Sequence, residues 1–512
     1  MVNENLFCAL RNGFPANLEA IAVETDDGLC YSWLDLERGS AMMANWLHSL
    51  SLPEGSRIAV QVEKSVEVLM LYLATLRSGH VFLPLNPAYQ ANEMAYFMTN
   101  AEPAVVVCSP DRFSWVSKLA FQSGTASVVS LDHQRGGTLL QRAVHHSDQH
   151  TPVHRHAHDL AAIIYTSGTT GRSKGAMLSH GNLSSNASML KDYWDWRAED
   201  VLIHALPIFH VHGLFVAIHA ALIGGSRMLW HSRFDPQKVM NDLPRASVLM
   251  GVPTFYTRLL ASNDLTRERC QAMRLFISGS APMLAETFAA WQTRTGHAVL
   301  ERYGMSETVM LTSNPCVADA RHGGATERIG GSVGFPLPGV ALRIVDEHHQ
   351  TVTTGEVGSI QVKGPGVFSG YWRMPERQTQ DFTSDGFFIT GDMGTVDHKG
   401  YVRIVGRSKD LIISGGLNVY PAEVENALNQ LPGVAESAVV AVPHADFGEV
   451  GFAFVIAKPG AELTCDALLS SLKQQLAAFK VPKHCLVVEE LPRNTMGKVQ
   501  KNLLRDLAKT AR

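Results

Sequence analysis

The chain has 512 residues, of which 46% are hydrophobic and 18% charged, and its formal net charge is −4. Because this length exceeds what one hydrophobic core normally supports, the sequence predicts two or more domains. The nearly balanced charge, with lysines and arginines scattered along the chain, excludes binding to nucleic acid through a basic surface.

The N-terminal stretch and the cysteines bear on the cellular compartment. MVNENLFCALRNGF has an early acid and no long apolar run, unlike a secretory signal or a transit peptide. No window approaches the roughly 18 apolar residues of a membrane-spanning helix, so no membrane partner is expected. The 7 cysteines are far apart and never form CxxC, a pattern typical of reduced thiols. The sequence therefore predicts a cytoplasmic enzyme without disulfides or a structural metal.

The region up to about residue 400 alternates short apolar runs with helical patterns, one of them near residues 66–78. The runs that predict strands are RIAVQV (57–62), AVVVCS (104–109), LAAIIYT (160–166), VLIHALP (201–207), SVLMGVP (247–253) and RLFISGS (274–280). Such β-branched runs, each leading into a helical stretch, indicate βαβ units with parallel sheets. Ligands bind such sheets at the carboxyl ends of the strands.

The pattern changes twice in the later part of the chain. GSIQVKG and GYVRIVG indicate antiparallel strands in a smaller, β-barrel-like section around residues 330–405. After GRSKD (406–410) follows a compact α+β unit with a helix over 466–479, and at about 100 residues it is large enough to fold alone. The predicted fold class is α/β, with a large N-terminal domain of parallel α/β sheets plus the small β section (1–406). A small, mobile α+β C-terminal domain follows (407–512).

The stretch YTSGTTGRSKGA (165–176) combines hydroxyls, glycines and cations directly after an apolar run. Its spacing fails the Walker A pattern G-x-x-x-x-G-K-[ST], because Lys174 is followed by a glycine. Hydroxyls and glycine-freed amides nevertheless suit an anion such as phosphate. The residues that offer them are Thr166, Ser167, Gly168, Thr169, Thr170, Gly171 and Gly175. A flexible surface turn is the alternative for this stretch alone.

Four single residues suit other parts of a bound nucleotide. Glu307 in ERYGMSET is a carboxylate suited to Mg2+ that bridges phosphates. Asp392 in FFITGDMG and Arg407 in GRSKD suit ribose hydroxyls. Lys498 lies in the polar stretch PRNTMGKVQK. Taken singly, each has an ordinary alternative as a solvated loop acid, a turn residue or a surface cation.

Taken together, these stretches resemble the adenylate-forming superfamily of acyl-CoA synthetases, peptide-synthetase adenylation domains and luciferases. YTSGTTGRSKGA, YGMSET, TGD, GRSKD and PRNTMGK occur in this order over essentially the whole chain. The resemblance implies an enzyme that uses ATP, Mg2+ and coenzyme A. A carboxylate attacks the α-phosphorus of ATP and expels pyrophosphate, and then the CoA thiol attacks the acyl-adenylate and expels AMP.

The resemblance also implies roles for individual residues. The 166–174 stretch holds the β- and γ-phosphates, Glu307 helps to hold Mg2+, and Asp392 with Arg407 holds the ribose. The residues that border the adenine are Gly279, Ser280, Ala281, Arg302, Tyr303 and Gly304. Lys498 bridges the attacking carboxylate and the α-phosphate. The C-terminal domain then rotates about a hinge and presents a pantetheine tunnel, with Lys409 at the hinge and Gly415 and Gly416 at the tunnel.

Four stretches expected to line the acyl pocket resemble malonyl-CoA synthetases most: LIHALPIFHVHGLFVA, VPTFYTRLL, LFISGSAP and VLERYGMSET. The second carboxylate of malonate needs a cation, and a planar guanidinium suits it best. Arg258 and Arg302 are the arginines of these stretches, although Arg258 has a helix cap or a surface ion pair as its alternative. The other predicted pocket residues are His210, Val211, His212, Ser278 and Met305. We therefore expect malonate as substrate, with methylmalonate tolerated.

Three other functions remain open at this stage. The first is a synthetase for another short- or medium-chain acid, and the second is an adenylation enzyme that loads a carrier protein. The third is a nucleotide-binding regulator without activity, which the intact Lys498, Glu307 and Asp392 disfavour. A lysine acetyltransferase and deacetylase that act on Lys498 are possible partners, because acetylation removes the lysine charge.

Overall fold

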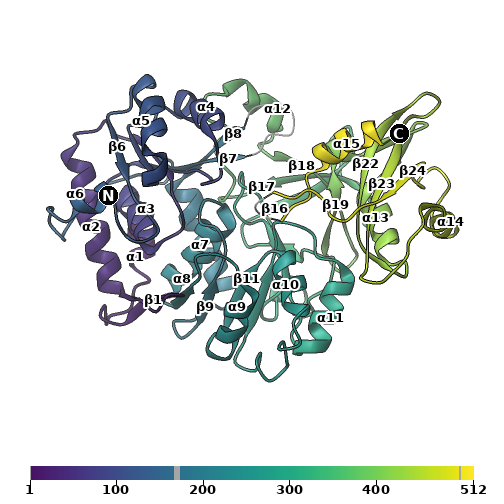
Figure 1. The fold of residues 1–512 in the computed structure, drawn as a ribbon, viewed down its shortest axis with the longest axis horizontal. Coiled ribbons are helices and arrows are strands. Elements are labelled where there is room, and N and C mark those ends of the chain that lie inside the picture. The colour runs from purple at the N-terminus through teal and green to yellow at the C-terminus, as the bar shows by residue number, and fades with distance from the viewer. Residues whose placement is uncertain (1, 167–172, 495–496, 512) are drawn as a thin grey trace.

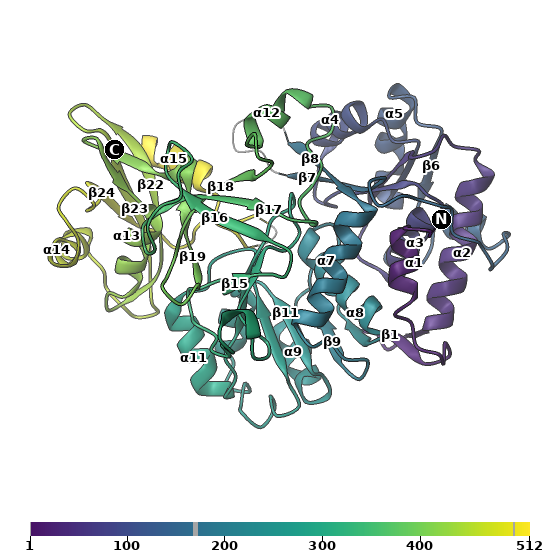
Figure 2. The ribbon, with the colours of Figure 1, turned by 180° about the vertical axis from the view of Figure 1, so that it is seen from behind.

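The computed structural model describes residues 2–166, 173–494 and 497–511. Within these residues the strands form four sheets. The N-terminal elements lie at one end of the elongated molecule and the last sheet at the other (Figures 1 and 2). The predicted α/β class, with parallel sheets in a large N-terminal part and a smaller C-terminal part, is confirmed.

The first sheet has the strand order β6-β5-β3-β4-β7-β8. Its strands are β3 (Arg57–Gln61), β4 (Val81–Pro84), β5 (Val105–Cys108), β6 (Ser127–Ser130), β7 (Leu160–Thr166) and β8 (Lys174–Ser179). The pairs up to β7 are parallel, as the βαβ pattern predicts, whereas β8 runs antiparallel to β7. This hairpin sets Thr166 opposite Lys174, so the two ends of the predicted phosphate loop lie side by side.

The second sheet has the order β15-β14-β13-β12-β11-β9-β10-β1-β2. Its strands are β1 (Ile21–Thr25), β2 (Cys30–Ser32), β9 (Val201–His204), β10 (Arg227–Trp230), β11 (Val248–Gly251), β12 (Leu275–Ser278), β13 (Leu300–Tyr303), β14 (Thr312–Ser313) and β15 (Phe335–Pro336). The strands from β1 to β13 are parallel neighbours, and β2, β14 and β15 are antiparallel at the two edges. The carboxyl ends of β11, β12 and β13 therefore lie at the same edge of the sheet.

Two further sheets complete the chain, the third antiparallel and the fourth mixed. The third sheet contains β16 (Ala341–Val345), β17 (Gly358–Lys363), β18 (Phe388–Val396) and β19 (Val402–Arg407), in that order. The fourth contains β20 (Ile412–Ser414), β21 (Leu417–Val419), β22 (Val434–His444), β23 (Gly448–Ala457) and β24 (His484–Val487). A short 3-10 turn, η6 (Ser408–Asp410), joins the third sheet to the fourth.

The helices cover these sheets. They are α1 (Leu6–Arg11), α2 (Trp33–Ser49), α3 (Val66–Arg77), α4 (Ala91–Ala101), α5 (Phe113–Gln122), α6 (Thr138–Ala143), α7 (His180–Tyr193), α8 (His219–Gly224), α9 (Pro236–Asp242), α10 (Pro253–Leu260), α11 (Ala285–Thr295), α12 (Gln378–Asp381), α13 (Pro421–Asn429), α14 (Cys465–Gln475) and α15 (Lys501–Thr510). The start of α3 is fixed by Ser65, whose hydroxyl accepts a hydrogen bond from the Val68 amide, a common N-cap arrangement. Helices long and apolar enough to span a bilayer are absent from the described part of the chain.

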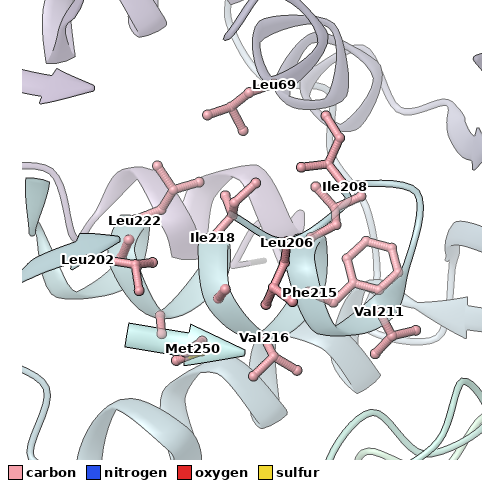
Figure 3. Close-up of a cluster of buried hydrophobic side chains, with 14 of the residues drawn as sticks. Leu69, Leu202, Leu206, Ile208, Val211, Phe215, Val216, Ile218, Leu222 and Met250 are labelled. Carbon is pink, nitrogen blue, oxygen red and sulfur yellow. The ribbon is translucent and has the colours of Figure 1, made fainter. Parts of the chain in front are cut away.

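The core lies between the first two sheets, around α3, whose residues are all buried. A π-helical segment, η2 (His212–Ile218), runs directly into α8. In Figure 3, Leu69 of α3 lies over Ile218 and Leu222, while Val216 faces Met250 of β11 on the opposite side. This packing fixes η2, and so the histidines at its start, between α3 and the second sheet.

Candidate functional site

The Glu307 carboxylate lies beside the base of the predicted phosphate loop. Glu307 is 5% exposed, and its Oε1 accepts a hydrogen bond of 2.7 Å from the Tyr371 hydroxyl. The Lys174 ammonium lies over the Tyr371 ring, 4.8 Å from the ring centroid. Burial raises the pKa of Glu307, and the Tyr371 hydrogen bond opposes this rise. Tyr371 thus joins the predicted phosphate lysine to the predicted Mg2+ ligand.

Asp392 and Arg407 pair across neighbouring strands of the third sheet. They are register partners in β18 and β19, and Arg407 Nε lies 2.7 Å from Asp392 Oδ1. The Tyr303 hydroxyl, at the end of β13, donates to Asp392 Oδ2 at 2.5 Å. Burial by itself lowers the pKa of Arg407, but Asp392 together with Tyr303, Glu307 and Asp410 outweighs it, so the pKa is raised. The two predicted ribose residues are therefore brought together, with both carboxylate oxygens oriented.

Lys498 reaches this site from the C-terminal part of the chain. Its side chain is exposed, although neighbouring protein atoms displace part of the water around its ammonium. This desolvation lowers the pKa of Lys498, Arg407 lowers it further, and Asp392 opposes both. The preceding residue, Gly497, touches α10: a Cβ added there would lie 2.9 Å from Thr254 Oγ1. The charges of Arg407 and Asp392 thus both act on the Lys498 ammonium.

Arg302 is a buried cation at the end of β13. It is 4% exposed, and its Nε and Nη2 have no hydrogen-bond partner among the described residues. Burial lowers the pKa of Arg302 to about 9, so the guanidinium stays charged at neutral pH. Its Cζ packs on Gly279, where an added Cβ would lie 2.4 Å away. A buried cation with free donors is costly unless an anion pairs with it.

Two neutral polar groups accompany Arg302. Ser278 Oγ is buried without a hydrogen-bond partner, and the same holds for His212 Nε2, within the described residues. His212 Nδ1 contacts Ser280 Oγ at 3.2 Å. Burial and the nearby Arg302 lower the pKa of His212 well below its usual value, so this imidazole is neutral. These groups together form a small polar site suited to a carboxylate.

The predicted adenine border lies at the ends of two adjacent parallel strands. β12 and β13 are parallel neighbours, and Ser278 lies opposite Glu301 in their register. The residues at the carboxyl ends of both strands therefore lie at the same edge of the sheet. The predicted residues that emerge there are Gly279, Ser280, Ala281, Tyr303 and Gly304. Gly304 is packed closely, since a Cβ there would lie 2.0 Å from the Val309 carbonyl oxygen. Arg302, the sixth predicted residue of this border, packs with its Cζ against Gly279.

The remaining predicted pocket residues lie around the start of η2. His210 Nε2 is buried without a partner among the described residues, and burial lowers the pKa of His210 to about 4. Val211 belongs to the hydrophobic core, at the edge of the cluster in Figure 3. Met305 packs against the same core. His210 is therefore a neutral polar group, whereas Val211 and Met305 are apolar.

Arg258 lies apart from this buried cluster. It is exposed on α10, whose buried face carries Phe255, Tyr256 and Leu259 instead. Arg258 lines a cavity of about 560 Å3 between the two parts of the chain, as do Phe209 and Gly497. Tyr256, which the sequence pattern does not single out, is buried on α10, and its hydroxyl donates to the Ile277 carbonyl oxygen at 2.7 Å.

The predicted hinge and tunnel residues lie on the C-terminal side. Lys409 is exposed within η6, and desolvation lowers the pKa of Lys409. Gly415 and Gly416 form the exposed turn between β20 and β21, both with positive φ, at 58° and 80°. A side chain at either position would be strained.

Of the predicted phosphate loop, Ser167, Gly168, Thr169, Thr170 and Gly171 lie outside the described residues.

Two family models cover most of the chain. "AMP-binding enzyme" matches residues 12–372, and "AMP-binding enzyme C-terminal domain" matches residues 423–498. The chain is 33% identical over 485 residues to a malonate–CoA ligase of Arabidopsis thaliana, covering 88% of this chain and 78% of the relative. It is 34% identical over 484 residues to a feruloyl-CoA synthase of an Amycolatopsis species, covering 93% and 94%.

Solved structures of one protein match over the full length. The ATP-bound crystal structure of MatB from Rhodopseudomonas palustris is 51% identical, covers 100% of both chains and superposes with a TM-score of 0.96. The apo crystal structure of MatB has the same identity and coverage but a TM-score of 0.85. The arrangement of the whole chain is therefore closer to that of the ATP-bound structure.

Proposed function

The chain belongs to the AMP-binding enzyme family, and we propose that it makes malonyl-CoA from malonate, ATP and CoA through a malonyl-adenylate. The observation that carries this substrate is the buried guanidinium of Arg302, which packs against Gly279 and has two donor nitrogens without a partner among the described residues. A dicarboxylate supplies the missing anion, whereas an acetate or butyrate tail does not. Methylmalonate is tolerated, because a single added methyl costs only about 1–3 kcal/mol in a pocket.

In the first half-reaction one carboxylate of malonate attacks the α-phosphorus, and pyrophosphate leaves. The described members of the phosphate loop, Thr166 and Lys174, serve the β- and γ-phosphates together with Ser167, Gly168, Thr169, Thr170 and Gly171. Asp392 and Arg407 hold the ribose, and the Gly279–Ala281 and Tyr303–Gly304 ends border the adenine. Lys498 stabilises the charge that develops between the carboxylate and the α-phosphate. Its place beside Asp392 and Arg407 supports this role.

Glu307 is the residue that fits Mg2+. It is a buried carboxylate with a hydrogen bond from Tyr371 on one oxygen, and it lies near the cation Arg407. A further cation at the other oxygen offsets the cost of burying this charge. When bound, Mg2+ neutralises charge on the ATP phosphates. Tyr371 holds Glu307 in the orientation needed for that ligand.

The second half-reaction uses a different face of the C-terminal domain. We divide the chain into an N-terminal domain (1–406) and a C-terminal domain (407–512) that rotates at Lys409. The exposed turn at Gly415 and Gly416 then lines the tunnel for the pantetheine arm. The thiol attacks the acyl carbon and AMP leaves. The higher TM-score to the ATP-bound relative supports the arrangement before this rotation.

Two further proposals concern the cell. Acetylation of Lys498 by a lysine acetyltransferase removes its positive charge and stops adenylation until a deacetylase restores it. The exposed side chain of Lys498 supports access for such enzymes. The 7 unpaired cysteines support a reducing compartment, the cytoplasm.

The test of the substrate is pyrophosphate release across a panel of malonate, methylmalonate, acetate, butyrate and ferulate, each with and without CoA. We expect kcat/KM for malonate to exceed that for butyrate by about 10⁴-fold or more, because a buried cation without its anion is penalised. Thioester formation with CoA separates this function from carrier-protein loading. Preference for ferulate or butyrate, or refusal of CoA, contradicts the proposal.

A second prediction tests the packing of Gly279 against Arg302. Gly279→Ala places a methyl 2.4 Å from Arg302 Cζ, so the guanidinium has to move. We expect kcat/KM for malonate to fall about 10²-fold, as displacement of a binding group by roughly 1 Å does. The same change in an Arg302→Met background is the control. If Gly279→Ala lowers kcat/KM for malonate by a further 10²-fold in the Arg302→Met background as well, the clash with Arg302 is not the cause of the loss.

A further inference from the structure

Lys498 is carried by a hairpin whose described residues are 492–494 and 497–500, called here the lysine hairpin. Arg493 and Val499 form an antiparallel bridge, and the Gln500 amide donates to the Pro492 carbonyl at 2.8 Å. The Asn494 amide donates to the Lys498 carbonyl at 2.9 Å. The Lys498 amide donates to Asn494 Oδ1 at 3.0 Å. The backbone on both sides of Lys498 is therefore fixed within the hairpin.

Arg493 links this hairpin to the fourth sheet. Its Nη1 donates to the Gly497 carbonyl oxygen at 2.6 Å, and its Nη2 pairs with Glu436 Oε2 on β22. The Gly497 carbonyl belongs to the peptide bond that joins Gly497 to Lys498. Because a peptide bond is planar, a hydrogen bond on this oxygen sets the direction in which the Lys498 side chain leaves. Both partners are only half exposed, at 28% and 31%, which limits screening by solvent.

Arg493, Gly497 and Glu436 all face the same part of the N-terminal domain. Arg493, Gly497 and Glu436 line the cavity of about 560 Å3 that Thr254 and Arg258 line from α10. Gly497 has φ 72° and lies close to Thr254, so the hairpin approaches α10 through a residue without a side chain. A shift of the Gly497 peptide therefore alters both the contact with α10 and the direction of Lys498.

We propose that the Arg493–Glu436 ion pair is a positioning device for Lys498, needed for adenylation and not for thioester formation. Glu436 holds the guanidinium, and the guanidinium holds the peptide bond that precedes Lys498. The device moves with the C-terminal domain, so its effect is confined to the half-reaction in which Lys498 meets the adenylate. This inference rests on the proposed two-step function.

The experiment measures the two half-reactions separately in full-length Arg493→Gln, Arg493→Lys and Glu436→Gln variants. Adenylation is followed by pyrophosphate release without CoA, and thioester formation by conversion of supplied malonyl-AMP and CoA. We expect Arg493→Gln to lower kcat for adenylation about 10- to 100-fold, with smaller changes in KM, because a misplaced group costs up to about 10²-fold. Thioester formation stays within about twofold. Arg493→Lys keeps one donor and retains more adenylation than Arg493→Gln.

The matched control is Lys480→Gln. Lys480 pairs with Glu423 at 2.6 Å in the same domain, with similar exposures of 26% and 36%, but joins α13 to the residues after α14. It should adenylate at the wild-type rate. The proposal is overturned if Arg493→Gln slows both half-reactions equally, which indicates a structural role, or slows neither. If the wild type prefers another acid, that acid and its adenylate are used instead, so failure of the malonate assignment remains distinguishable.

Discussion

Lys498→Ala is expected to lower the rate of adenylate formation about 10²- to 10³-fold, the loss typical of one preorganised contact to a developing charge. The charges of Arg407 and Asp392 act on the Lys498 ammonium, which places it near the site of attack on the α-phosphorus in the proposed reaction. Conversion of supplied malonyl-AMP and CoA to malonyl-CoA should continue at the wild-type rate, because the proposed rotation of the C-terminal domain moves the lysine away before this step. Pyrophosphate release and thioester formation are measured separately.

Lys501→Ala is the control for this prediction. Lys501 lies at the start of α15 and pairs with Glu425 at 2.7 Å, so it is a nearby cation with a different partner. Adenylation by this variant should stay within about threefold of the wild type, since an exposed or half-exposed ion pair contributes about 1 kcal/mol or less. An equal loss of both half-reactions in Lys498→Ala rules out the assigned role of Lys498.

Arg302→Met is expected to abolish the preference for malonate. Malonate kcat/KM should fall about 10⁴-fold, whereas butyrate should improve, because the buried cation is replaced by an apolar chain of similar length. Without ligand, the variant should unfold at a higher temperature than the wild type, since the wild-type guanidinium is buried with two donors that lack a partner in the described part of the chain. Malonate should raise the unfolding temperature of the wild type but not of the variant.

The conservative variant Arg302→Lys separates charge from geometry. A lysine keeps the cation but offers one ammonium in place of the planar fork, so malonate activity should lie between those of the wild type and Arg302→Met. Wild-type kcat/KM values for malonate and butyrate within tenfold of each other contradict the pairing of Arg302 with a second carboxylate. So does an Arg302→Met variant that malonate still stabilises.

The parallel strands could be predicted because their apolar runs carry the pattern locally. β7 has the bounds of the predicted run 160–166, and β11 and β12 lie within theirs. The sequence does not predict β8, since KGAMLS has little strand propensity of its own. β8 depends on pairing with β7 and on distant contacts, such as the Trp372 amide donating to the Gly175 carbonyl at 2.8 Å.

The candidate site residues that lie in short motifs could be predicted from the sequence. Asp392 and Arg407 are examples, and they pair across β18 and β19. Its supporting residues were not, because they act through long-range contacts. Tyr371 reaches Glu307 from 64 positions away, and its stretch has no motif that announces the contact. Arg258 lies in a stretch that the sequence does single out, but its place on the helix was not predicted. The helical period of α10 buries Tyr256 and Leu259, so Arg258 points to the exposed side.

The close approach of Gly279 to Arg302 also constrains how this pocket can diverge. A side chain at position 279 has no room while the guanidinium occupies its place, 2.4 Å from the first carbon atom. A substitution of Arg302 can come first, because loss of the arginine does not strain Gly279. Descendants that acquire larger apolar acids therefore have to change position 302 before position 279. The order of changes at these two positions therefore matters for this substrate range, and a library that varies position 279 alone should yield chains with reduced activity toward malonate.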